Sequence, residues 1–205
     1  MDRRELLKMI ALATGSAVIG GEFFLSGCTS GTKTEAGFSP ANISLLDEVG
    51  ETILPATSTP GAKAAQVGQF MKMYVTECYS QAEQDQFGKG IVALQETCQK
   101  KFSKSFMDCT PEQRSELLTG LEQEAKKYNS EQIEKDKPTY EDLKKKNQWD
   151  KFVASPVHYY TMMKQLTLLG FFTSKEGATQ AMRHVAVPGH YDGALAYKKG
   201  DKAYS

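Results

Sequence analysis

The sequence has no excess of charge of either sign and lacks the short motifs that mark most cofactor sites. Lysine and arginine number 25, as do aspartate and glutamate, so the net charge is zero. This balance provides no basic field for nucleic acid and no acidic field for cations. Gly-x-Gly-x-x-Gly, Gly-x-Ser-x-Gly and Cys-x-x-Cys-His are all missing. These absences argue against nucleic-acid binding, and against FAD, NAD, covalent haem or serine-hydrolase chemistry in this chain.

Histidine is scarce, and its placement gives little support to a metal site. The three histidines are His158, His184 and His190. His184 and His190 lie either side of a Pro-Gly turn and Asp192 follows, but a zinc site would need a further ligand. We therefore expect His158 on a helix surface and the other two in an irregular segment. A metal-dependent enzyme that uses His184, His190 and Asp192 remains as an alternative hypothesis.

The amino terminus has the pattern of an export signal. Arg3 and Arg4 are followed by Leu6, Leu7 and Lys8, which is the arrangement of a twin-arginine signal. The apolar stretch after it, residues 9–21, is too short and too weak for a membrane span. Leu-Ser-Gly then precedes Cys28, as at a lipoprotein cleavage site. We expect export by the twin-arginine pathway and a lipid on Cys28 that holds a periplasmic protein to a membrane.

The other cysteines leave two interpretations open. Cys78, Cys98 and Cys109 remain, too few and too widely spaced for an iron–sulfur cluster. Cys98 and Cys109 lie across an expected turn and are candidates for a disulfide, with Cys78 as a competitor. The alternative, which we favour, is that all three are small buried side chains, because a pathway for folded cargo loads it in a reducing compartment.

Hydrophobic periodicity predicts a mainly α fold: a small helical domain with long irregular loops and an extended C-terminal tail. We divide the chain into a signal (1–27), a flexible tether (28–40) and one domain (41–205). Helices are expected at 43–54, 67–79, 84–102 and 174–183. Another is expected from a cap formed by Thr110, Pro111 and Gln113 to about Tyr128. A further helix is expected from Pro156, with Ser155 as its cap, to residue 172. Residues 129–148 are expected to be a charged, solvated insertion, partly helical at best. Residues 185–205 are expected to be an aromatic tail.

Several strings together resemble the gluconate 2-dehydrogenase subunit 3 family. They are Glu-Thr-Ile-Leu-Pro-Ala-Thr (51–57), Thr-Pro-Gly-Ala (59–62), Leu-Thr-Leu-Leu-Gly-Phe-Phe-Thr-Ser (166–174) and Val-Pro-Gly-His-Tyr (187–191). One departure is Tyr204, where the resemblance would lead us to expect Trp. The resemblance covers roughly residues 43–204.

The resemblance implies a non-catalytic role. Such small subunits bind a flavoprotein of the glucose–methanol–choline (GMC) type, carry it through the twin-arginine pore and anchor it. The FAD and the catalytic residues then belong to the partner, which oxidises sugars, sugar acids or glucosides, and a cytochrome c subunit often takes the electrons. A lipid-anchored scaffold with another cargo remains as an alternative.

Two segments are the best candidates for contact with that partner. They are the loop Thr59-Pro60-Gly61 and the tail, with Pro188, Gly189, Tyr191, Tyr197 and Tyr204. Tyrosine offers a large contact area with a polar tip, and a glycine-rich tail can hardly fold alone. Tyr159, Tyr160, Phe171 and Phe172 are instead expected in the core.

Overall fold

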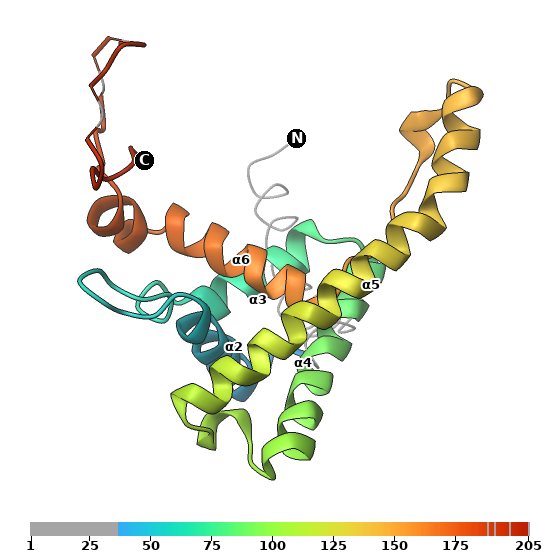
Figure 1. Ribbon diagram of the computed structural model, residues 1–205, viewed down its shortest axis with the longest axis horizontal. Coiled ribbons are helices and arrows are strands. Elements are labelled where there is room, and N and C mark those ends of the chain that lie inside the picture. The colour runs from blue at the N-terminus through green and yellow to red at the C-terminus, as the bar shows by residue number, and fades with distance from the viewer. Residues whose placement is uncertain (1–36, 188, 191, 197, 205) are drawn as a thin grey trace, which may run out of the picture. The chain divides into compact units, whose positions relative to one another are not determined.

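The computed structural model describes residues 37–187, 189–190, 192–196 and 198–204, all within one unit of the chain. Its long helices are α2 (Pro40–Ile53), α3 (Val67–Cys78), α4 (Gln81–Phe102), α5 (Pro111–Lys145) and α6 (Tyr159–Thr173) (Figure 1). There are also three short elements. The 3-10 helix η3 (Phe106–Asp108) lies between α4 and α5, the 3-10 helix η4 (Trp149–Lys151) lies between α5 and α6, and the π-helical η5 (Gly177–Ala181) follows α6. The part of the chain described here has an isolated Arg183–Tyr204 bridge but no strand. The predicted mainly α fold is confirmed.

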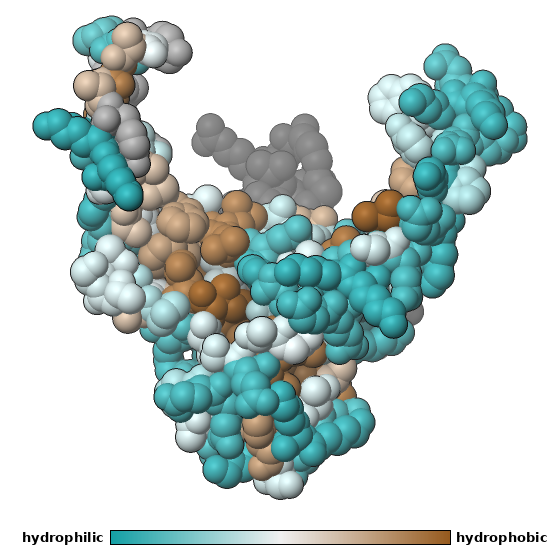
Figure 2. All heavy atoms as spheres, viewed as in Figure 1, coloured by the Kyte–Doolittle hydropathy of each residue, from teal (hydrophilic) through white to brown (hydrophobic). Residues whose placement is uncertain are grey.

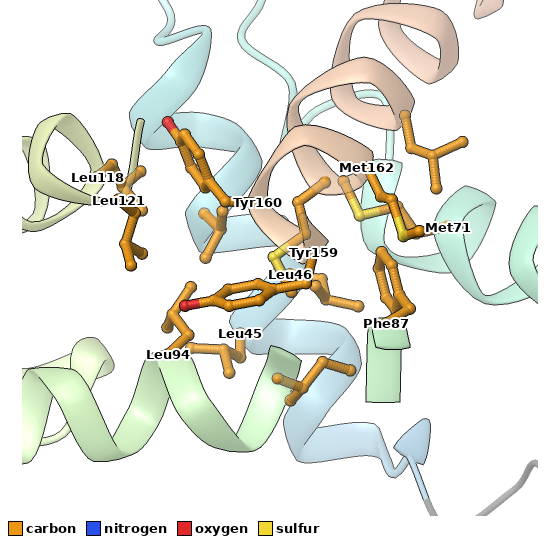
Figure 3. Packing of buried hydrophobic residues seen from close by; sticks show 14 of the residues in the cluster. Leu45, Leu46, Met71, Phe87, Leu94, Leu118, Leu121, Tyr159, Tyr160 and Met162 are labelled. Carbon is orange, nitrogen blue, oxygen red and sulfur yellow. The ribbon is translucent and has the colours of Figure 1, made fainter. Parts of the chain in front are cut away.

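Helix α6 lies at the centre of this unit. It contacts α2, α3, α4 and α5, and its buried side chains meet those of all four (Figure 3). From α6 the core takes Tyr159, Tyr160, Met162, Met163, Leu166 and Phe171; the other helices add residues such as Leu46, Met71, Phe87, Leu94 and Leu121. The predicted burial of Tyr159, Tyr160 and Phe171 is confirmed. The prediction for Phe172 is wrong, because 39% of its surface is exposed.

Helix α5 is longer than the sequence indicated. Thr110, Pro111 and Gln113 form the predicted capping box at its start. The helix does not end near Tyr128, however, but continues to Lys145, so the expectation that residues 129–148 are partly helical at best is wrong. These residues are rich in Glu, Lys and Gln, which favour helix even without an apolar face.

The returning chain also supports the second half of α5. The Asp136 carboxylate accepts hydrogen bonds from the Ser155 backbone N–H (2.7 Å) and hydroxyl (2.8 Å), which hold the pKa of that carboxyl below its usual value. The ring centroids of Tyr140 and Phe152 lie 5.3 Å apart. A charged helix is therefore stabilised by the segment that follows it, which the periodicity of either alone does not indicate.

The start of α6 also differs from the expectation. Ser155 and Pro156 lie outside the helix, which begins at Tyr159 with His158 as its N-cap. The Ser155 hydroxyl donates to the Asp136 carboxylate and makes no cap on α6. His158 instead accepts a hydrogen bond on its ring Nδ1 from the Tyr160 backbone N–H (3.3 Å). The backbone N–H of His158 donates to the side-chain oxygen of Asn129 on α5 (2.8 Å).

His158 is buried, which corrects the expectation that it lies on a helix surface. Only 4% of its surface is exposed, and its ring packs against those of Tyr128 and Tyr159. Burial disfavours the charged imidazolium and lowers the pKa of His158, while the Glu124 carboxylate 3.9 Å away offsets part of this effect. The neutral ring is the form that can cap α6, because Nδ1 must be unprotonated to accept.

Two smaller expectations have mixed outcomes. The short helix expected at 174–183 forms over a narrower range, residues 175–181, and most of it is the π-helical turn Gly177–Ala181. Cys78 is exposed, whereas we expected it to be buried with Cys98 and Cys109.

Two glycines of α4 give a matched test of this packing. A Cβ on Gly90 would lie 2.2 Å from the Cβ of Tyr159, whereas a Cβ on Gly88 would meet nothing within 4 Å. Gly90→Ala should therefore lower the free energy of unfolding by about 1–3 kcal/mol through overpacking against α6. Gly88→Ala should raise it by up to about 1 kcal/mol through helix propensity. Urea unfolding of both variants checks this; equal effects would contradict the packing of α6 on α4.

The buried cap predicts a pH dependence of stability. The pKa of His158 in the folded state lies below the ordinary 6.5, so on acidification the unfolded chain takes up the proton first. The stabilisation that the neutral His158 cap provides is complete above pH 6.5 and is lost as the pH falls below that value. Between about pH 8 and about pH 5, the wild type should lose more stability than His158→Asn, which keeps an uncharged cap. Parallel curves from chemical denaturation would contradict this assignment.

Candidate partner-binding surface

The loop between α2 and α3 is held by one carboxylate. Glu51, near the end of α2, accepts hydrogen bonds from the backbone N–H groups of Ala56 (2.8 Å) and Lys63 (2.9 Å). A Cβ on Gly61 would lie 2.3 Å from both Glu51 carboxylate oxygens. Only glycine can therefore pass the carboxylate at this point. The predicted contact loop has a fixed shape, with Thr59 and Pro60 half-buried and Gly61 buried.

The outer face of α6 changes from polar to apolar along its length. Thr161, Lys164 and Gln165 lie on the face toward its start, and Leu168, Leu169 and Phe172 lie on the face toward its end. The last three are exposed by 38%, 41% and 39%. Hydrophobic surface gathers over α6 in Figure 2. We call Leu168, Leu169 and Phe172 the α6 apolar patch.

The polar part of this face borders a hollow of about 300 Å³ between α5 and α6. Glu122 of α5 forms ion pairs there with Lys164 (3.1 Å) and Lys126 (3.4 Å), and the bond from Lys164 lowers the pKa of the Glu122 carboxyl. Leu168 lines the same hollow. Fixed charge pairs therefore border the α6 apolar patch on its α5 side.

The tail packs back onto the chain just after η5. The Arg183 backbone N–H donates to the Ala203 carbonyl (2.7 Å), and the Arg183 guanidinium lies 4.9 Å from the centre of the Tyr204 ring. Tyr204 is still 49% exposed and Gly189 is exposed. One face of the Tyr204 ring is thus bound by a cation, and half of its surface is left for other contacts.

The structure brings the predicted loop and the base of the tail to the C-terminal half of α6. The space beside Gly50 of α2 is bordered by Ala62 of the loop and Thr167 of α6. At the other side η5 follows α6 directly and contacts it, and the tail begins there (Figure 1). The loop meets α6 on its buried side, at Thr167, so the α6 apolar patch by itself is the candidate surface. An interface role for Thr59, Pro60, Gly61, Gly189 and Tyr204 stays a prediction.

Leu168, Leu169 and Phe172 were not predicted as surface residues. A signal was present, since at 100° per residue these three fall on the same helix face as Thr161, Lys164 and Gln165. The continuous apolar run from 166 to 172 concealed it.

The other candidate sites have clear outcomes. Cys98 and Cys109 lie together, with their sulfurs 3.3 Å apart and both thiols free. His184, His190 and Asp192 form no metal-binding group. Among the described residues, no group of three or more His, Cys, Asp or Glu side chains could hold a metal ion. Within the same residues, no helix has the length and hydropathy needed to cross a bilayer.

Several predicted residues lie outside the described part of the chain. They are the export residues Arg3, Arg4, Leu6, Leu7 and Lys8, the lipidation residue Cys28, and the tail residues Pro188, Tyr191 and Tyr197.

Comparison with known proteins gives a match over most of the chain. Residues 40–189, which run from the first residue of α2 through η5 to the tail, match the family described as gluconate 2-dehydrogenase subunit 3. No curated protein and no solved structure matches the chain. The match includes the loop between α2 and α3 and the whole of α6, which carries the α6 apolar patch. The chain belongs to the gluconate 2-dehydrogenase subunit 3 family.

Proposed function

We propose that this chain is a non-catalytic small subunit that binds, co-exports and membrane-anchors a GMC-type, FAD-dependent dehydrogenase. The family is described as subunit 3 of a gluconate 2-dehydrogenase, which supports the other subunits of such a complex as partners of this chain. In this proposal the partner holds the FAD and oxidises a sugar, sugar acid or glucoside. A cytochrome c subunit that takes the electrons would be a further partner.

The observation that supports partner binding most strongly is the α6 apolar patch. Three large apolar side chains lie together on the central helix of the core, each more than a third exposed. Apolar groups gathered on one face, with polar groups around them, are typical of protein–protein interfaces. Because α6 is packed on the other helices, the patch is rigid, and binding there costs little conformational entropy.

The amino-terminal sequence supports the export and anchoring parts of the proposal. Arg3 and Arg4 begin a twin-arginine signal, and this pathway moves folded proteins. A partner that has no export signal of its own and is bound to the α6 apolar patch would be exported together with this chain. A lipid on Cys28 would then hold the complex at the membrane, and the Ser, Thr and Gly residues after it suit a flexible tether.

Substitution of the α6 apolar patch should weaken binding without unfolding the chain. The double variant Leu169→Asp/Phe172→Asp places two charges where the partner would exclude water, so we expect the dissociation constant to rise at least about thirtyfold. Val92→Asp is the matched control, since Val92 is 56% exposed on α4, and it should bind normally. Titration calorimetry with the dehydrogenase subunit measures both, and circular dichroism checks the fold. Equal affinity for all three chains would overturn the placement of the interface.

Purification from the native membrane tests the function itself. The tagged chain should bring a stoichiometric yellow flavoprotein, and Arg3→Lys/Arg4→Lys should leave both proteins in the cytoplasm. Cys28→Ser is the control: it should still export the partner but release the complex from the membrane fraction. A lone, colourless chain would contradict the carrier role and favour a scaffold for another cargo.

A further inference from the structure

Two buried thiols meet at the corner between α4 and α5. Cys98, in the last turns of α4, is fully buried, and Cys109, just after η3, is 5% exposed. Their sulfurs lie 3.3 Å apart. The third thiol of the described chain, Cys78, is exposed at the end of α3. One pair is therefore in contact, and the remaining cysteine differs from it in exposure.

Contacts other than a covalent bond hold this corner in place. The Arg114 side chain donates to the carbonyl oxygens of Phe106 (2.9 Å) and Met107 (2.7 Å), and it forms an ion pair with Glu48 of α2. Phe106 is completely buried beneath the guanidinium. Three separate contacts thus fix the turn that presents Cys109 to Cys98. Closing a bond between the two sulfurs would need only a small local shift and no rearrangement of the helices.

We propose that Cys98 and Cys109 are a disulfide-forming pair that closes when the chain meets a disulfide oxidant. In the reaction the Cys109 sulfur attacks the oxidant's S–S bond, forms a mixed disulfide and releases one thiolate. The Cys98 sulfur then attacks Cys109, the Cys98–Cys109 bond forms and a second thiolate leaves. The two protons of the original thiols pass to the two released thiolates, so two thiols are oxidised and one disulfide is reduced.

The surroundings favour Cys109 as the first sulfur to react. Burial and the contact with Cys109 raise the pKa of the Cys98 thiol, so Cys98 stays protonated. Cys98 is also fully buried and has no direct route to solvent. Cys109 retains slight exposure beside a loop, residues 103–105, that contains the left-handed Ser103. The disulfide would link the end of α4 to the start of α5, with ten residues between the two cysteines. It would thereby restrict the unfolding of residues 103–105.

The test uses the purified full-length chain and glutathione. Reduced protein is incubated with oxidised glutathione, both folded and during refolding from urea, then blocked with iodoacetamide and digested with trypsin without reductant. Cleavage at the lysines between Cys98 and Cys109 separates the two cysteines into different peptides. We expect these peptides to be joined and lighter by two hydrogen atoms, while the Cys78 peptide carries glutathione or the blocking group.

Matched variants make the outcome decisive. Cys78→Ser should leave the joined peptides unchanged, whereas Cys98→Ala should leave Cys109 unpaired. Oxidation should raise the melting temperature of the wild type by about 5–10 °C and leave that of Cys98→Ala/Cys109→Ala unchanged. Blocked thiols or glutathione on both Cys98 and Cys109 under folded and refolding conditions, or a bond from either to Cys78, would overturn the proposal.

Discussion

The burial of α6 among four other helices is the constraint on which the rest of the structure depends. α6 supplies the largest share of the core, and each neighbouring helix places apolar residues against it. Close approach is possible because Gly90 of α4 accepts the Tyr159 side chain and Gly170 of α6 accepts the Phe70 ring. Hydrophobic burial of this kind is the main favourable term in folding. Loss of the packing between α6 and any one of these helices would expose the apolar side chains of α6 that the other helices also contact.

The same constraint defines the surface that remains for a partner. A helix packed on most sides has only a narrow outer face, and on α6 this face ends in Leu168, Leu169 and Phe172. These side chains lie on the helix that packs against four others. In the proposed carrier role the chain recognises a folded partner, and an apolar patch on a packed helix suits that task.

One carboxylate on α2 links the loop between α2 and α3 to the turn that presents Cys109. Glu48 of α2 forms an ion pair with Lys63 after the loop (2.7 Å) and another with Arg114 at the thiol corner. The hydrogen bond from Lys63, with the charge of Arg114, holds the pKa of the Glu48 carboxyl below its usual value. Glu48 and Arg114 are largely shielded from solvent, and Lys63 is exposed. The loop between α2 and α3 and the turn that presents Cys109 are therefore fastened to the same turn of α2.

The sequence by itself determined the mainly α class, the cap at Thr110, the burial of Tyr159, Tyr160 and Phe171, and the family. These features depend on local spacing, on capping residues and on short strings that a single chain shows directly. Only the tertiary structure decided that α5 continues to Lys145 and that His158 is buried as a cap. The Asp136 carboxylate of α5 accepts hydrogen bonds from Ser155, and the Asn129 side chain of α5 accepts one from the His158 backbone. Each of these outcomes depends on a contact between residues far apart in the sequence, and periodicity along one segment holds no information about which face another segment will cover.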